Sequence, residues 1–386
     1  MVADATVGAA EADAVLEVLR SRWLSAGART RAFEQEFARA LGVPDAVAVS
    51  SGTAALHLAM LALGISAGDE VIMPSLSFVG AAEVVALAGA VPVFADVRSE
   101  RDLTVDPGDV SRLVTSRTKA IVAMHYGGFP ADLVRLRAIA DHHGVALVED
   151  AAHAPVVRAG DRTVGAVGDL GCFSFHAAKN ITTGEGGMVV GSDAGLLARV
   201  RAMRSHCLSV TTEDRMRTGE AHYDVTGVGL NYRPTEISSA LGRVQLAKLA
   251  DDRARRRAVC ASYRAALRDH PDVVVPFADR VGDSAHHLFV ILVPPGVRRD
   301  RLRAGLAAEG IQTSVHYPPT HLFSFYRRTF ASARRPLPVT ERVAPRLLTL
   351  PMHARMSDDD AVLVGRAVTS LLDRLREEVG HGVHGS

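Results

Sequence analysis

Five short runs of apolar and β-branched residues alternate with segments of helical periodicity in the first 150 residues of the chain. The runs occupy residues 46–49, 71–73, 91–94, 120–124 and 145–148. Strands that are separated by helices predict right-handed βαβ crossovers and a mostly parallel sheet, buried on both faces. Two further apolar runs, at 170–175 and 187–190, complete a predicted sheet of seven strands. These runs place the chain in the α/β class.

Helical patterns flank this region on both sides. Amphipathic segments at 9–20 and 30–41 predict two N-terminal helices, the second ending at Gly42. A long helical pattern over 235–268 leads into a mixed region, with a strand at 287–293 and helices at 299–309 and 357–377. We therefore expect a large domain with an N-terminal arm over 1–245, a smaller α+β domain over 246–386, and disorder in the tail 379–386.

The composition excludes several functional classes. The 386 residues carry a formal net charge of +1, and the basic residues are scattered, which argues against a nucleic-acid-binding surface or an anionic-membrane anchor. No apolar run is long enough to span a membrane, and the N-terminus lacks the pattern of an export signal. Cys172, Cys207 and Cys260 are far apart and form no metal-binding or disulfide pattern, so we expect a cytoplasmic protein.

Lys179 lies between an apolar run and a glycine-rich turn, in the stretch 170–188. An ammonium group that leaves apolar surroundings is poorly solvated, which lowers its pKa and makes the amine a better nucleophile. The alternative is a solvated lysine beside a turn. The stretch by itself does not decide between them.

A predicted strand end, a turn of small residues and a helix follow one another at 50–60. The first turn of such a helix has free N–H groups and a favourable dipole, so that Gly52, Thr53 and Ala54 could bind a phosphate. Alternatively, Thr53 only caps the helix.

Asp150 and Phe78 also follow predicted strands. The side chains of Glu149 and Asp150 point to opposite faces, so that only one carboxylate can enter a given site. A buried Asp150 needs a cationic partner, such as a protonated ring nitrogen or an arginine. Phe78 could stack on a flat ring or pack in the core.

A lysine nucleophile, a phosphate-binding helix start, a strand-end aspartate and an aromatic residue together indicate a pyridoxal phosphate site. The glycine patterns of dinucleotide-binding and P-loop proteins are missing from the sequence, and the histidine pairs lack the spacing of metal ligands. His316 and His321 flank Tyr317 and could line a substrate pocket.

The motifs resemble those of the DegT/StrS-like nucleotide-sugar aminotransferases, pyridoxal phosphate-dependent enzymes with the aspartate-aminotransferase fold, fold type I. The matches are SGTAAL at 51–56, GAVPVF at 89–94, HYGGFPAD at 125–132, EDAAHA at 149–154, FSFHAAKN at 173–180 and GEGG at 184–187. Each motif is weak alone, but their order and spacing are highly specific, and the resemblance covers nearly the whole chain. A large domain with a seven-stranded sheet and a smaller C-terminal domain are implied.

The resemblance also implies a role for each matching residue. Lys179 would bind pyridoxal phosphate covalently, and Asp150 would pair with the pyridine nitrogen. Thr53, Ala54 and Ser174 would hold the phosphate, Phe78 would stack on the ring, and His153 would lie beside the phenolic oxygen. The family shares its sites across a homodimer, so that Asn231 would reach the phosphate of the neighbouring subunit.

The implied reaction moves an amino group from L-glutamate or glutamine to a keto sugar through the pyridoxamine 5′-phosphate form. The EDAAH and FSFHAxK variants look more like family members that act at C4 of a nucleotide-linked 4-keto-6-deoxyhexose than like those that act at C3. Tyr317, His316, His321 and Arg233 are candidate substrate contacts. The alternatives are a ketocyclitol aminotransferase, a dehydratase that forms an aromatic amine, and a non-catalytic sensor that binds the cofactor. The sugar dehydratases of the family have histidine where this chain has Lys179.

Overall fold

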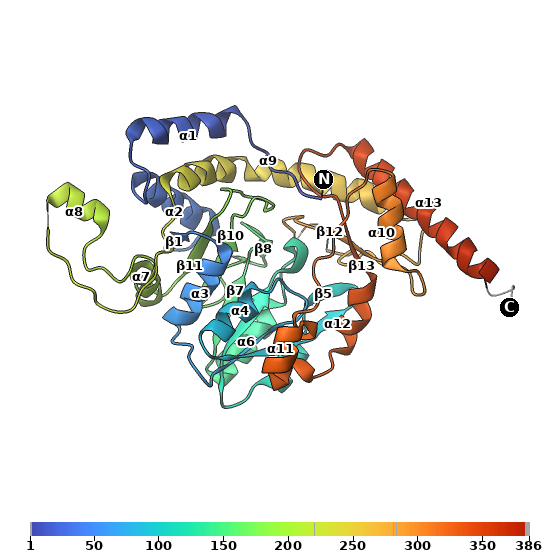
Figure 1. Ribbon diagram of the computed structural model, residues 1–386, viewed down its shortest axis with the longest axis horizontal. Coiled ribbons are helices and arrows are strands. Elements are labelled where there is room, and N and C mark those ends of the chain that lie inside the picture. Colours follow the sequence, from blue (N-terminus) through green and yellow to red (C-terminus); the bar gives the residue numbers. More distant parts are fainter. Residues whose placement is uncertain (1, 220, 281, 283, 383–386) are drawn as a thin grey trace.

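The computed structural model describes residues 2–219, 221–280, 282 and 284–382 (Figure 1). Its centre is a seven-stranded sheet in the order β1-β11-β10-β7-β6-β2-β3. In that order the strands are Asp45–Val49, Gly187–Gly191, Leu170–Ser174, Ala146–Asp150, Thr118–Met124, Glu70–Pro74 and Val91–Ala95. Each of the seven predicted runs forms one of these strands. The prediction of a mostly parallel α/β sheet is therefore confirmed.

One strand runs against the other six. β11 pairs antiparallel with both β1 and β10, whereas β10, β7, β6, β2 and β3 pair in parallel. A single reversed strand between β1 and β10 leaves those two strands pointing the same way. The carboxyl ends of six strands therefore meet at one edge of the sheet, which is where ligands bind in sheets of this kind.

Helices cover both faces of the sheet. One apolar core joins it to α2 (Ala28–Leu41), α5 (Pro107–Leu113) and α6 (Leu133–His143). A second core, on the other face, joins it to α3 (Gly52–Ala62), α4 (Gly80–Leu87) and α7 (Ala194–Met203). Three short hairpin or turn elements complete this region: β4 with β5 (Val97–Ser99, Asp102–Val105), β8 with β9 (Arg158–Ala159, Arg162–Thr163), and a 3-10 turn at Tyr126–Gly128.

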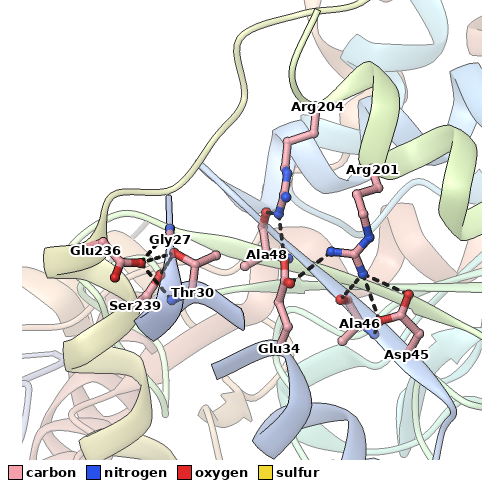
Figure 2. Close-up of polar contacts among 10 residues, drawn as sticks. All are labelled: Gly27, Thr30, Glu34, Asp45, Ala46, Ala48, Arg201, Arg204, Glu236 and Ser239. Carbon is pink, nitrogen blue, oxygen red and sulfur yellow. Dashed lines mark hydrogen bonds and ion pairs between the residues drawn. The ribbon is translucent and has the colours of Figure 1, made fainter. Parts of the chain in front are cut away.

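The long helix α9 (Glu236–Ala266) joins the N-terminal helices to the C-terminal region, and α1 (Ala9–Ser21) and α2 pack against it (Figure 1). Its first residue, Glu236, is buried and accepts hydrogen bonds from the N–H groups of Gly27 and Thr30 at 2.8 Å and from the Thr30 hydroxyl (Figure 2). Because first-turn N–H groups have no partner within their helix, this carboxylate both caps α2 and fixes it to α9.

A second charged cluster holds α2 and α7 against β1. Glu34 of α2 accepts from Arg201 at 2.9 Å and from Arg204 at 2.6 Å, and Arg201 also binds Asp45 at the start of β1 (Figure 2). The Arg204 guanidinium also donates a hydrogen bond to the carbonyl of Ala48. These contacts anchor the strand that leads directly into α3.

The C-terminal region has a core of its own, built on the antiparallel pair β12 (Phe289–Leu292) and β13 (Leu347–Leu350). The helices α10 (Arg299–Ala308) and α13 (Asp358–Gly382) pack with this pair and with α9. The remaining short helices are α11 (Ser324–Thr329), α12 (Pro338–Val343) and the 3-10 turns at Thr320–Leu322, Ala331–Arg334 and Ala344–Arg346. Tyr326 and Leu337, from the segment around α11 and α12, are buried in the core of the large sheet.

The C-terminal region differs in two ways from what the sequence predicts. The expected boundary between residues 245 and 246 falls inside α9, since this helix is continuous through both regions. The prediction of a disordered tail is wrong for residues 379–382, because α13 continues to Gly382. The rest of that tail, 383–386, lies outside the described residues.

Candidate active site

A cavity of about 440 Å³ opens at the carboxyl ends of the strands. It is lined by nine of the thirteen residues that the sequence singled out, namely Gly52, Thr53, Phe78, Asp150, His153, Ser174, Lys179, His316 and Tyr317. The first seven follow or end β1, β2, β7 and β10, and the last two come from the C-terminal region. The fold therefore brings together side chains from both regions of the chain.

Lys179 stands in a tight turn after β10, and its N–H donates to the carbonyl of His176 at 2.9 Å. The next residue, Asn180, is buried and fixes the turn through the carbonyl of Ala285 and through His287. Burial lowers the pKa of Lys179 to about 8, against the opposing charge of Asp150. At pH 7 roughly a tenth of this lysine is therefore an unprotonated nucleophile, far more than for an ordinary lysine.

Asp150 is the last residue of β7, and Cys172 of β10 is its register partner. Its carboxylate accepts a hydrogen bond from the N–H of Ala152 at 3.1 Å. Burial raises the pKa of Asp150, although this N–H and Lys179 oppose the shift. Among the described residues no arginine lies within ion-pair distance of this carboxylate, so the arginine alternative has no support.

Glu149 has a different environment on the opposite face of the strand. It is completely buried and accepts from the N–H groups of Gly165, Val167 and Gly168 and from Nε2 of His125. Although burial opposes the shift, these hydrogen bonds lower the pKa of Glu149. The alternation of strand side chains therefore separates a structural carboxylate from the one in the cavity.

The start of α3 forms one end of the cavity. Ser51, and not Thr53, caps the helix, because its hydroxyl accepts from the N–H of Ala54 at 3.0 Å. A Cβ on Gly52 would lie 2.7 Å from Cβ of Ser174, so only glycine allows β10 to come this close. The free first-turn N–H groups and the hydroxyls of Thr53 and Ser174 surround a space suited to an anion.

His153 and Tyr317 form the other end of the cavity. Nδ1 of His153 accepts from the N–H of Gly127 at 3.3 Å, and its Nε2 lies 2.9 Å from the Tyr317 hydroxyl. The His287 ring lies 4.3 Å from that of His153, measured between centroids. His287 is a site residue that sequence reasoning missed, since nothing in the HH pair at 286–287 distinguishes it from other histidines.

Phe78 is 56% exposed, and its ring centroid lies 6.0 Å from that of Tyr317. A large apolar side chain that is this exposed beside a cavity is not packed in the core, which excludes the alternative that Phe78 is a core residue. The ring is therefore free to stack on a ligand.

Four predicted residues lie outside the lining of this cavity. Ala54 is buried, with its N–H occupied by Ser51. His321 is buried between Ser75 and Glu341, which bind its two ring nitrogens. Arg233 donates to the Ser205 hydroxyl beside a separate cavity of about 420 Å³, and Asn231 is exposed next to it.

Comparison with known proteins decides the class of the enzyme. The model of the DegT/DnrJ/EryC1/StrS aminotransferase family matches residues 5–369. The chain belongs to this family. Its members are pyridoxal phosphate-dependent sugar aminotransferases, and this chain is an enzyme of that kind, with their type I fold.

Individual members of the family are similar over nearly their whole length. The spore coat polysaccharide biosynthesis protein SpsC of Bacillus subtilis (strain 168) is 38% identical over 371 residues, which are 95% of each chain. The aminotransferase TlmJ of Streptoalloteichus hindustanus is 36% identical with a TM-score of 0.90, over 97% of this chain and 99% of its own. DesI, whose structure was determined in the presence of its TDP-sugar product, is 34% identical with a TM-score of 0.88, over 99% of this chain and 94% of its own.

The residues of the cavity fit the cofactor of the family. Because Gly52 has no Cβ, the start of α3 can approach Ser174 closely and leave room for a phosphate. Burial raises the pKa of Asp150 in spite of the charge of Lys179, and a pyridinium partner would favour the ionised carboxylate. Lys179 has the lowered pKa that a nucleophilic amine needs. No helix in the described part of the chain is long and apolar enough to cross a membrane.

Proposed function

We propose that this enzyme transfers an amino group from L-glutamate or glutamine to the ketone of a nucleotide-linked 4-keto-6-deoxyhexose, in the biosynthesis of an amino sugar. The observation that carries the proposal is the pairing, in one cavity, of Lys179, whose pKa is lowered to about 8, with the buried carboxylate of Asp150, whose pKa is raised by burial. This pair suits the transfer of a proton at a carbon next to an amine.

Each residue has a defined part in this proposal. Pyridoxal 5′-phosphate, when bound, supplies an electron sink that stabilises negative charge on the donor's α-carbon. Lys179 holds the cofactor and then, as a free amine, moves the proton from that carbon. Asp150 keeps the ring nitrogen protonated, and Gly52, Thr53 and Ser174 hold the phosphate. A ketone then receives the nitrogen through the same steps in reverse.

The relatives support a nucleotide-linked sugar as the acceptor. The structure of DesI was determined in the presence of its TDP-sugar product, and SpsC is a spore coat polysaccharide biosynthesis protein. The EDAAH and FSFHAxK motifs favour C4 over C3. His316 is the substrate contact that we retain from the sequence, since it lines the cavity, and Tyr317 lines the same cavity. A ketocyclitol remains the alternative acceptor, because the cofactor residues would serve it equally.

We also propose a homodimer with shared sites. Asn231 is exposed, and Arg233 lies near it, outside the cavity of its own chain. The segment 205–219, which carries α8 (Thr212–Thr218), projects from the rest of the fold (Figure 1). This placement supports delivery of Asn231 to a neighbouring subunit. The cysteines Cys172, Cys207 and Cys260 are free thiols, which supports a reducing, cytoplasmic location.

Absorbance spectroscopy tests the proposal directly. The purified protein should show the long-wavelength band of covalently bound cofactor, and L-glutamate should replace it with the shorter-wavelength band of pyridoxamine 5′-phosphate. A panel of nucleotide-linked 3-keto and 4-keto sugars and ketocyclitols then follows, and the ketone that restores the first band identifies the acceptor class. A bound cofactor that no amino acid converts would instead favour the non-catalytic sensor.

A further inference from the structure

The hydrogen bonds of His153 determine which way the Tyr317 hydroxyl donates. The N–H of Gly127 donates to Nδ1 of His153, so this nitrogen carries no proton. Burial, with the charge of Lys179, holds the pKa of His153 well below its ordinary value, so the ring is neutral. Its one proton is therefore on Nε2, which donates to the Tyr317 oxygen at 2.9 Å. The proton of the Tyr317 hydroxyl must point to a different acceptor.

No side chain or backbone group among residues 2–219, 221–280, 282 and 284–382 supplies that acceptor, since His153 is the hydrogen-bond partner of this hydroxyl. Tyr317 lines the same cavity as Lys179 and Asp150. Burial and the charge of Asp150 raise the pKa of Tyr317, so that the hydroxyl keeps its proton at neutral pH. The Tyr317 hydroxyl is therefore a neutral hydrogen-bond donor that is available to a ligand in the cavity.

The strand order indicates which part of that molecule it meets. The phosphate end of the cavity, at Gly52 and Ser174, follows β1 and β10 on one side of β7. Asp150 ends β7 itself, and Gly127 follows β6 on the other side. With its phosphate at α3 and its ring nitrogen toward Asp150, pyridoxal phosphate would turn its third edge toward the β6 side. That edge carries the phenolic oxygen.

We propose, on the basis of the proposed function, that Tyr317 donates a hydrogen bond to the phenolic oxygen of the bound cofactor and that His153 is a positioning residue for Tyr317. This assignment differs from the one that family resemblance implies, in which His153 itself lies beside that oxygen. With the cofactor held by Lys179, the phenolic oxygen would lie close to the nitrogen of this lysine, and its charge would affect the pH at which that nitrogen loses its proton. A donor on the oxygen stabilises its negative charge, so that the proton leaves the lysine nitrogen at a lower pH.

A pH titration of the absorbance spectrum of the cofactor-loaded protein tests this assignment. In Tyr317→Phe the midpoint of the spectral change should rise by roughly one pH unit, as expected for the loss of one charge-assisted hydrogen bond. Tyr263→Phe is the control, since that hydroxyl donates to the carbonyl of Pro351 in the C-terminal core, and its midpoint should not move. An unchanged midpoint in Tyr317→Phe would overturn the assignment.

Cofactor binding gives a second readout that needs no turnover. The wild-type protein should bind pyridoxal phosphate about tenfold or more tightly than 3-deoxypyridoxal phosphate, which lacks the oxygen, and Tyr317→Phe should lose most of this preference. An equal loss of affinity for both molecules would make Tyr317 merely structural. A midpoint that moves in His153→Gln but not in Tyr317→Phe would make His153 the donor. If neither molecule binds, the proposed function fails and this inference with it.

Discussion

Glu149 and Asp150 are neighbours at the end of β7, yet their carboxylates lie on opposite faces of the sheet in different surroundings. Asp150 lines the cavity with one backbone hydrogen bond, while Glu149 accepts three backbone N–H groups of the 165–168 loop and one from His125. The end of β7 therefore supplies one carboxylate that can act on a ligand, that of Asp150, and one that stabilises the fold, that of Glu149.

Glu149→Gln should destabilise the fold strongly. The amide NH₂ of glutamine would face N–H donors that now bind a carboxylate, leaving buried groups unpaired. We expect the free energy of unfolding in urea to fall by about 3–5 kcal/mol. The control Glu17→Gln, at an exposed side chain, should stay within about 0.5 kcal/mol of the wild type. Similar losses for both variants would contradict the structural role of Glu149.

The rate at which pyridoxal phosphate attaches to the cofactor-free protein should rise with pH and level off near pH 8. Only the unprotonated amine attacks, and burial lowers the pKa of Lys179 to about 8. Below this value the rate should fall about tenfold per pH unit. Stopped-flow absorbance from pH 6 to 10 measures it. A rate that keeps rising toward pH 10 would show an ordinary solvated lysine, and Lys179→Ala should show no attachment.

The same lysine should make the cofactor-free protein more stable at alkaline pH. Its pKa is about 8 in the folded state, whereas that of an ordinary, solvated lysine is 10.5. Between these values the unfolded chain binds the extra proton, so the stability contributed by this group rises with pH. The unfolding free energy of the wild type, relative to that of Lys179→Met, should rise by about 3 kcal/mol from pH 7 to pH 11. Urea denaturation of both proteins at each pH measures this difference. A constant difference between the two proteins would refute the lowered pKa.

Gly52→Ala should impair the anion-binding end of the cavity. The new Cβ would lie 2.7 Å from Cβ of Ser174, so that β10 and the start of α3 must separate. We expect cofactor affinity to fall at least about tenfold and unfolding free energy to fall by about 1–3 kcal/mol. Gly8→Ala is the control, because its Cβ would meet nothing closer than 3.9 Å. Titration of the cofactor band measures the affinities, and unchanged binding in Gly52→Ala would argue against a phosphate there.

Glu236→Ala should weaken the attachment of α2 to α9. The buried carboxylate accepts from the N–H groups of Gly27 and Thr30 (Figure 2) and from that of Arg29, and its loss leaves these first-turn donors unpaired. We expect a loss of about 2–4 kcal/mol in thermal or urea unfolding. Glu36→Ala breaks the surface ion pair with Arg243 between the same two helices and should cost about 1 kcal/mol or less. Equal losses of unfolding free energy in the two variants would show that Glu236 is not the main contact that holds α2 against α9.

Local sequence was sufficient for the elements of the fold. The seven strands follow from short apolar runs, and α9 begins one residue after the capping Thr235. Helix-capping preferences could also have identified Ser51, which precedes Gly52 and is a favoured cap residue. The reversed direction of β11 had no local signal, because an apolar run that is buried on both faces has the same pattern in either direction.

The sequence by itself determined which residues end the strands and therefore which side chains can gather at one edge of the sheet: Lys179, Asp150, Thr53 and Ser174. Only the tertiary structure decided which distant residues join them. Tyr317 and His287 reach the cavity because the C-terminal region packs across the strand ends, while His321 and Arg233 do not. Periodicity and capping act over a few residues, whereas these contacts depend on how two packed regions meet, which no local pattern encodes.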